Sequence, residues 1–222
     1  WEDVIMTKVY KYGIDISAHN GDINLSAYKD KFVIIRAGYS VTTDKKAIRN
    51  MNLCEQLGIP YGVYWYSYAL NVKRAKEEAE ACLKVIGKRK PQVGVWFDME
   101  DADGYKRKNG MPSNKTISAM CNAFCNIISD AGFYAGVYAS ESWLINKIKN
   151  VKYPKWVASW GADNGKLGKT KADLGVMHQY TSKPLDKDVI YVPLSTFGLK
   201  TPSKKKTTTE IAKEVIAGKW TT

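Results

Sequence analysis

The sequence predicts an α/β protein, an irregular and compact (β/α) TIM-like barrel with some helices shortened or missing. Short apolar runs alternate with helical patterns or loops, which is typical of parallel β/α architecture. Up to eight such runs fit between residues 10 and 199. A regular barrel has ~250 residues, so this one would be small. Neither a G-x-G-x-x-G nor a G-x-x-x-x-G-K-[ST] motif occurs, which disfavours the competing open, nucleotide-binding sheet.

The expected strands are bounded by turn residues and are rich in Val, Ile and aromatic side chains. They are expected at 9–17, 32–39, 61–69, 93–100, 133–139, 155–160, 175–181 and 186–192. Helices are expected at 23–28, 46–57, 71–86, 113–130 and 141–148. The helix at 71–86 is the clearest, because Asn71 can cap its first turn and Gly87 follows its last. Ser140 can likewise cap the helix at 141–148.

The chain of 222 residues is strongly basic, with a net charge of +12 and a pI near 9.4. Such a surface attracts polyanions such as nucleic acid, anionic membranes or other anionic polymers. The lysines are dispersed rather than clustered, so a nucleic-acid partner is not expected. No apolar run is long enough for a transmembrane segment. Nothing in the sequence indicates an oligomeric state.

Cysteine and histidine usage argues against metal and nucleophile chemistry. The four cysteines lack metal or redox spacing and are expected to be core thiols in a protein that folds in a reducing compartment. His19 and His178 are the only histidines, too few for a zinc site without clustered cysteines. No G-x-S-x-G elbow supplies a serine nucleophile. Neither a metal nor a cofactor is therefore expected.

The composition changes at both ends of the chain. Residues 1–9 are expected to be a leader, with 1–5 interpreted as an expression remnant, and no signal peptide is visible. Residues 10–199 form the expected domain. Residues 200–209 read as a basic, polar linker, and 210–222 resume an amphipathic helical pattern that is too short to form a domain.

The run at 93–100 ends in two carboxylates, Asp98 and Glu100. Side chains at i and i+2 of a strand share a face, with Cα atoms ~6.6 Å apart. This spacing suits a pair in which one carboxyl protonates a glycosidic oxygen while the other stabilises positive charge or activates a water molecule. Considered alone, such a pair is more often a solvated strand end than a catalytic site.

The other strand ends favour the functional interpretation, because a barrel carries its site where the strands end. Carboxylates recur there with aromatic and other polar side chains between them. The candidates are Asp15, Arg36, Tyr39, Tyr64, Tyr66, Asp98, Glu100, Tyr138, Trp160, Gln179 and Asp186. Sugars offer apolar faces to aromatic rings and hydroxyls to carboxylates, so this set predicts a glycan groove.

Several segments carry a resemblance to a known family. They are YGIDIS with Asn20-Gly21, FVIIRAGY, GIPYGVYWYSYA, WFDME, GVY, WVASW and QYTS, in this order between residues 10 and 198. The sequence resembles glycoside hydrolase family 25, the lysozymes (N-acetylmuramidases) of phage endolysins and bacterial wall enzymes. The resemblance implies cleavage of the β-1,4 bond between N-acetylmuramic acid and N-acetylglucosamine in bacterial peptidoglycan. Glu100 then falls on the general acid, Asp98 on its assisting carboxylate and Asp15 on the floor of the site.

The late aspartate of the family aligns with Asp186, but the glycine of its usual context is missing, and Asp188 is a rival. Residues 210–220 resemble the opening of a wall-binding repeat. The resemblance implies an endolysin made in the host cytoplasm that acts on the cell wall, where anionic wall polymers would attract its positive charge. A secreted bacterial enzyme is the alternative.

Two other functions remain open. A chitinase-like enzyme would act on another N-acetylhexosamine polymer, but Val93 and Trp96 stand where the chitinase motif needs aspartates. A non-catalytic glycan-binding barrel is the other, and the intact carboxylate pair argues against it.

Overall fold

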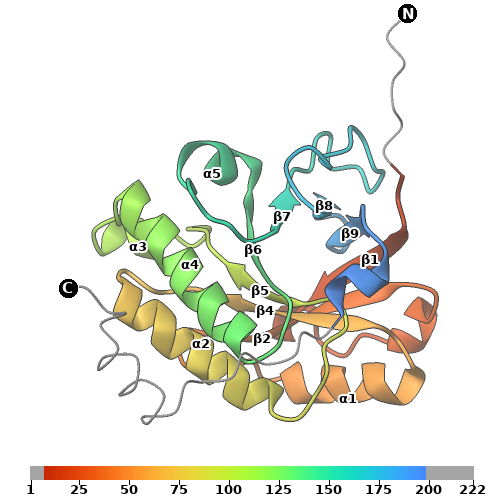
Figure 1. Ribbon diagram of the computed structural model, residues 1–222. Coiled ribbons are helices and arrows are strands. Elements are labelled where there is room, and N and C mark those ends of the chain that lie inside the picture. Colours follow the sequence, from red (N-terminus) through yellow and green to blue (C-terminus); the bar gives the residue numbers. More distant parts are fainter. Residues whose placement is uncertain (1–7, 199–222) are drawn as a thin grey trace, which may run out of the picture.

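The structure is a computed structural model and describes residues 8–198. The linker expected at 200–209, the repeat start at 210–222 and most of the leader lie outside the described residues. The described strands close into a barrel (Figure 1). In order around it they are β1 (Lys11–Ile16), β2 (Phe32–Tyr39), β4 (Tyr61–Tyr66), β5 (Val95–Asp98), β6 (Ala135–Ser140), β7 (Lys155–Ala158), β8 (Met177–Thr181) and β9 (Lys187–Ile190), which pairs back with β1. The expected irregular barrel is confirmed.

The last strand departs from the parallel pattern. β9 runs antiparallel to both β8 and β1, whereas β1 to β8 pair in parallel around the barrel. Only residues 182–186 connect β8 to β9, and a parallel return would need a crossover of a dozen or more residues. β9 therefore starts at the edge where the parallel strands end, which brings Asp186 to the same edge as Asp98. A two-residue strand, β3 (Thr42–Thr43), is paired to the outside of β2.

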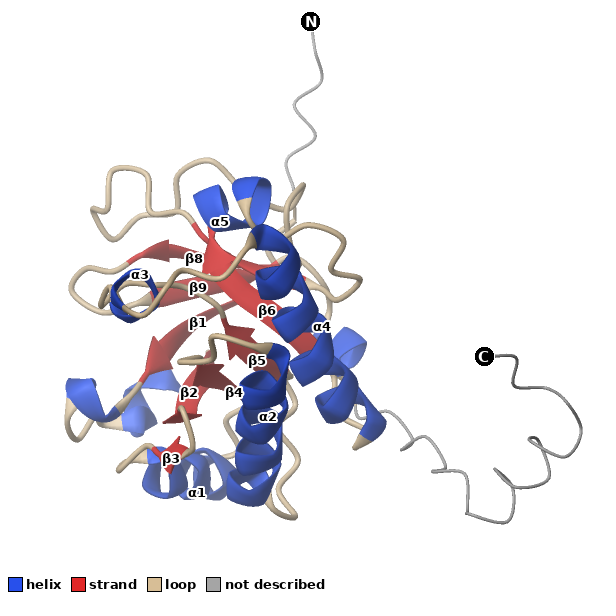
Figure 2. Ribbon diagram, turned by 90° about the vertical axis from the view of Figure 1, so that its left-hand side faces the viewer, coloured by secondary structure: helices blue, strands red, loops and turns tan. Residues whose placement is uncertain are grey.

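Helices cover only part of the barrel. The long ones are α1 (Ala47–Leu57), α2 (Val72–Ile86) and α4 (Asn114–Asp130), and α2 and α4 lie side by side (Figure 2). Asn71, Ser113 and Ser140 cap their helices through side-chain oxygens, which confirms the caps expected at Asn71 and Ser140. The shorter helices are α3 (Tyr105–Lys108) and α5 (Glu141–Asn146), and short 3-10 turns are η1 (Ala18–Asn20), η2 (Leu25–Tyr28) and η3 (Leu194–Phe197).

The helix expected at 23–28 is thus only the turn η2, and the helix expected at 141–148 ends two residues early. Within the described part of the chain, β7 is followed by an irregular connection to β8, and β8 by a hairpin to β9. Neither of these described strands is followed by a helix as in a regular barrel. None of the described helices combines the length and the apolar character needed to cross a membrane.

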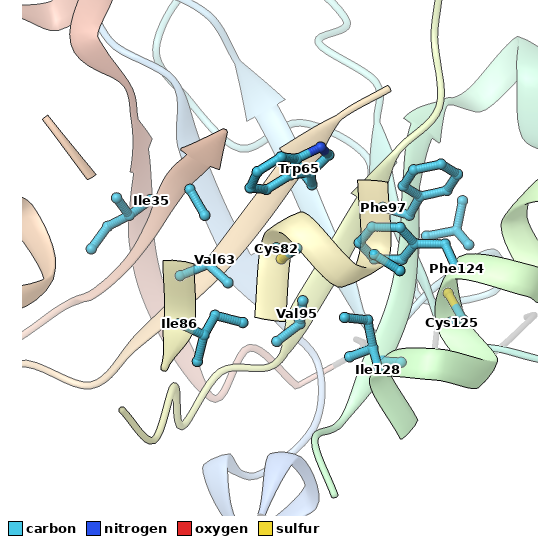
Figure 3. Packing of buried hydrophobic residues seen from close by; sticks show 14 of the residues in the cluster. Ile35, Val63, Trp65, Cys82, Ile86, Val95, Phe97, Phe124, Cys125 and Ile128 are labelled. Atoms are coloured by element: carbon cyan, nitrogen blue, oxygen red, sulfur yellow. The ribbon is translucent and has the colours of Figure 1, made fainter. Parts of the chain in front are cut away.

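Side chains point alternately to the two faces of each strand, and they form two separate hydrophobic clusters, one outside and one inside the barrel. Val95 and Phe97 of β5 face α2 and α4, where Phe97 stacks on Phe124 with ring centroids 4.1 Å apart (Figure 3). Trp96 lies in a separate cluster with Tyr138 and Trp156. Because neighbours in a strand face opposite ways, Asp98 shares the side of Trp96 and points into the barrel. The four cysteines are buried free thiols, as expected.

The barrel interior is filled by aromatic rings. A Cβ at Gly136 would lie 2.2 Å from the Trp96 ring, so only glycine leaves room for this indole. Phe197 of η3 packs against Trp96 and Tyr134, with ring centroids 6.3 and 4.9 Å away. Tyr134 directly precedes β6, so this packing fills the end of the barrel at which the parallel strands begin. Open space remains at the opposite end.

Candidate active site

A pocket of about 310 Å³ lies where the parallel strands end. It is lined by strand-end side chains that the sequence predicts as a site, namely Asp15, Arg36, Tyr64, Tyr66, Asp98, Glu100, Tyr138, Trp160, Gln179 and Asp186. Tyr39 is the exception. It lines an adjoining pocket of about 450 Å³, which shares Arg36 and Tyr66 with the first. Residues from strands far apart in the sequence converge here because the barrel closes.

Other pocket residues escape the sequence prediction. They are Ser17, His19, Asn20, Ala102 and Trp156. Ser17 and Asn20 bracket the turn after β1, where the Ser17 amide donates to Asn20 Oδ1 at 2.8 Å. The polar run at 18–22 directly follows a strand, so strand-end reasoning could have included it. Trp156 lies in mid-strand and reaches the pocket from below, and a strand-end rule misses it.

The carboxylate pair straddles the end of β5. Asp98 is its last residue and is 3% exposed, and its Oδ1 meets no hydrogen-bond donor among the described residues. Glu100 lies beyond the strand and is partly exposed in the pocket. Burial raises the pKa of Glu100 to about 7. Burial and the Glu100 charge raise the pKa of Asp98. The pair therefore retains a proton near neutral pH, as a proton donor must.

A buried lysine supports this pair, and the sequence does not predict it. Lys106 belongs to the basic run 106–108, where no helix is expected, yet it is 1% exposed and lies in α3. Its ammonium group donates to the carbonyl oxygens of Ser67 and Glu100, the latter at 2.6 Å. Burial lowers the pKa of Lys106, and the charges of Asp98 and Glu78 oppose that shift. Composition cannot reveal which lysine of the run turns inward.

Gln179 connects the floor of the pocket to one wall. Its Nε2 donates to Asp15 Oδ2 at 2.7 Å, and its Oε1 accepts from the Tyr138 hydroxyl at 2.9 Å and from Trp160 Nε1 at 2.8 Å. Burial and the neighbouring Asp186 charge raise the pKa of Asp15 to about 8. The bonds fix the orientation of the indole and the phenol, so these rings present preformed surfaces to a ligand.

Arg36 is held at the rim by Asp44, another residue absent from the sequence prediction. Arg36 Nε lies 2.7 Å from Asp44 Oδ2, and Asp44 is buried. The same oxygen accepts from the Ala18 amide at 3.1 Å. One carboxylate thus ties the guanidinium to the turn after β1, which also lines the pocket.

The two late aspartates occupy different places. Asp186 lines the pocket, and burial raises its pKa to about 6. Asp188 lies deeper, where its Oδ1 accepts from Trp156 Nε1 at 2.9 Å and its Oδ2 meets no donor among residues 8–198. Burial, followed by the charges of the nearby Asp15 and Asp186, raises the pKa of Asp188 and disfavours its ionised form.

We expect Asp188→Asn to stabilise the protein near neutral pH. The folded-state pKa of Asp188 is raised, so stability is present at low pH and falls as pH rises from about 4, where the unfolded carboxyl ionises, towards the folded pKa. Asparagine cannot ionise, and its Oδ1 can still accept the hydrogen bond from Trp156 Nε1. The gain should be clear at pH 7.5 and near zero at pH 4, where the carboxyl is largely protonated in both states. Thermal melts at both pH values measure it, with Asp173→Asn as the exposed control. An equal loss of stability at both pH values would contradict the raised pKa of Asp188.

The chemistry of the pocket is that of carboxylates within an aromatic wall. A larger hollow of about 670 Å³ lies against α2 and β3, but none of the strand-end carboxylates lines it. Within residues 8–198, no group of three or more His, Cys, Asp and Glu side chains is arranged to hold a metal ion. The pocket combines a partly exposed acid, a buried carboxylate with one oxygen unpartnered among the described residues and an exposed indole, which together suit a sugar whose bond is broken by proton transfer.

Comparisons with known proteins agree with this geometry. The sequence profile described as glycosyl hydrolases family 25 matches residues 14–189. The modular autolysin LytC from Streptococcus pneumoniae, solved with a synthetic peptidoglycan ligand, is 30% identical with a TM-score of 0.69. That match covers 81% of this chain and 46% of LytC, so the chain spans about half the length of the autolysin. Among curated proteins, none matches.

Two further solved structures share the fold. The catalytic domain of endolysin ply40, from bacteriophage P40 of Listeria monocytogenes, is 24% identical with a TM-score of 0.69, and the match covers 81% of this chain and 92% of that domain. A family 25 glycosyl hydrolase from Bacillus anthracis is 19% identical with a TM-score of 0.72, covering 87% and 96%. Since the family profile matches most of the chain, including every strand of the barrel at least in part, the protein belongs to glycosyl hydrolase family 25.

Proposed function

We propose that this protein is a peptidoglycan hydrolase that cleaves the β-1,4 bond between N-acetylmuramic acid and N-acetylglucosamine. The observation that carries the proposal is the pair at the end of β5, a half-buried Glu100 with a pKa of about 7 beside the buried Asp98, whose Oδ1 has no hydrogen-bond donor among the described residues. Family membership supports glycosidase chemistry. The peptidoglycan ligand of the related autolysin supports the choice of polymer.

Glu100 is the general acid of the proposed reaction. It is the member of the pair that is partly exposed in the pocket, so it can reach the glycosidic oxygen of a bound glycan. As the bond breaks, its proton passes to the leaving oxygen and positive charge develops on the sugar ring. The positive charge on the sugar favours the ionised form of Asp98. The Asp98 carboxylate in turn stabilises that positive charge.

The remaining side chains bind and orient the glycan. Asp15 and Asp186 are the other pocket carboxylates, and they stabilise charge, orient a water or position the 2-acetamido group of the substrate. Tyr64, Tyr66, Tyr138 and Trp160 offer ring surfaces to the sugar faces. Arg36 and Gln179 offer hydrogen bonds to its polar groups, and Tyr39 extends the binding surface into the adjoining pocket.

The proposed place of action is the bacterial cell wall, reached after synthesis in the host cytoplasm as for an endolysin. Both an autolysin and a phage endolysin are among the similar structures. The net charge of +12 would hold the enzyme near anionic wall polymers while the glycan enters the pocket.

Product analysis tests the proposal. Purified peptidoglycan is digested with the protein, and the fragments are reduced with borohydride and identified by mass spectrometry. We expect new reducing ends on muramic acid only. Reducing ends on glucosamine would show cleavage of the other bond. Release from chitin oligosaccharides, but not from peptidoglycan, would favour the chitinase-like alternative, and binding without release would favour a non-catalytic barrel.

A further inference from the structure

A second pocket, of about 360 Å³, adjoins the candidate active site and has the opposite charge. Most of its lining residues belong to the irregular connection between β7 and β8, which is drawn at the upper right of Figure 1. Lys166, Lys169 and Lys171 line it, and no carboxylate is among the described residues of its lining. His178 contributes no charge, because burial lowers its pKa and its ring nitrogens are occupied by Tyr191 and a backbone oxygen.

Trp160 joins the two pockets. Its side chain lines both, and it is 44% exposed although its Nε1 is fixed by Gln179. A ligand that lies across this indole would therefore have one part beside the carboxylates of the active site and another beside the lysines.

Two of these lysines are available for a ligand. Lys171 is paired with Glu141 at 2.6 Å. Lys166 and Lys169 are exposed and form no ion pair within residues 8–198. The loop that carries them is anchored: Asp163 accepts from the Ser182 amide at 2.7 Å and from the Thr181 hydroxyl at 2.8 Å, and the Gly165 amide donates to Thr181 Oγ1 at 3.1 Å. The positive charges thus stand on a fixed backbone beside the groove.

We propose that this cationic pocket binds carboxylates of the peptide branches that peptidoglycan carries on muramic acid. The inference rests on the proposed function and refines its substrate. Peptidoglycan consists of a neutral glycan with anionic peptide branches, and this matches a pocket for a neutral sugar beside a pocket for an anion. Chitin has no such branches and would leave the lysines unpaired. The polymer is therefore selected at Lys166 and Lys169, away from the bond that is cleaved.

The test uses the double variant Lys166→Gln/Lys169→Gln in the full chain. Lys88→Gln/Lys90→Gln is the matched control, because it removes the same charge from exposed positions between α2 and β5, at the opposite end of the barrel. The substrates are peptidoglycan stripped of teichoic acid, the same material with its carboxyls capped as neutral amides, and walls that retain teichoic acid. Initial rates of reducing-end release give KM and kcat.

We expect the pocket variant to raise KM for stripped peptidoglycan about fivefold with kcat unchanged. On capped peptidoglycan, it should match the wild type. Equal KM values for the pocket and control variants on stripped material would overturn the proposal. A loss confined to walls with teichoic acid would also overturn it, because the anion would then be phosphate. If the wild type releases no muramic reducing ends from any substrate, the proposed function itself fails.

Discussion

Glu100→Gln should abolish wall lysis while leaving the fold intact. Glutamine keeps the shape of the side chain but cannot deliver a proton, and general acid catalysis is worth about a hundredfold to ten-thousandfold in rate. We therefore expect at least about a thousandfold loss in turbidity clearing of cell walls and in reducing-end release. Because Glu100 has a raised pKa in the folded state, its ionisation opposes folding, and the variant should melt no lower than the wild type near pH 7.

A matched control is available on α2. Glu77 is paired with Arg74 at the surface and does not line the candidate active site, so Glu77→Gln should retain full activity. In the wild type, activity should decline as pH rises through about 7, since Glu100 then loses its proton. Lysis by Glu100→Gln at a rate close to that of the wild type would exclude Glu100 as the acid.

Lys106→Met should impair both stability and catalysis. Methionine fills a similar volume but leaves the carbonyl oxygens of Ser67 and Glu100 without their donor, and it removes the positive charge beside buried Asp98 and Glu78. Breaking a buried charge cluster in this way costs about 3 kcal/mol. We expect a lower melting temperature and at least about a tenfold lower kcat, since Glu100 loses the bond that fixes its backbone.

The pH dependence of activity distinguishes a positioning role of Lys106 from a purely structural role. The Lys106 charge lowers the pKa of Glu100, so its removal should move the decline in activity to higher pH. Lys108→Met, on the same short helix but exposed, should change neither stability nor profile. If Lys106→Met does not fold, Lys106→Arg can be used instead. It keeps the charge, so its activity should decline at about the same pH as that of the wild type. A folded Lys106→Met with an unchanged profile would refute the role.

Much of the framework could be predicted from local patterns. The run at 32–39 matches β2 residue for residue, because a buried strand of a parallel sheet is a nearly continuous apolar run. Asn71 and Ser140 can be predicted as caps because each is a short polar side chain directly before a helical pattern. In that position its oxygen can accept a hydrogen bond from a free amide of the first helical turn. Asp98 and Asp186 could be placed in one site, because a barrel brings its strand ends together.

The remaining features depend on contacts that are distant in sequence. Lys106 is buried because Ser67, 39 positions away, offers it a carbonyl oxygen. Asp188 lies below the pocket because it meets Trp156 and Asp15, which belong to other strands. The placement of Tyr39 in the adjoining pocket depends on how β2 continues past the barrel rim, and no periodicity encodes that position.

The uneven helical cover has a consequence for how this enzyme can change. α2 and α4 hold β5 and its acid in place through the core around Phe97, whereas no described helix follows β7. Insertions and substitutions in the β7–β8 connection would therefore leave the packing beneath Glu100 untouched. One side of the groove can diversify while the other keeps its chemistry. Exchanging this single loop between members of the family is accordingly the most direct way to test whether it determines which polymer the groove accepts.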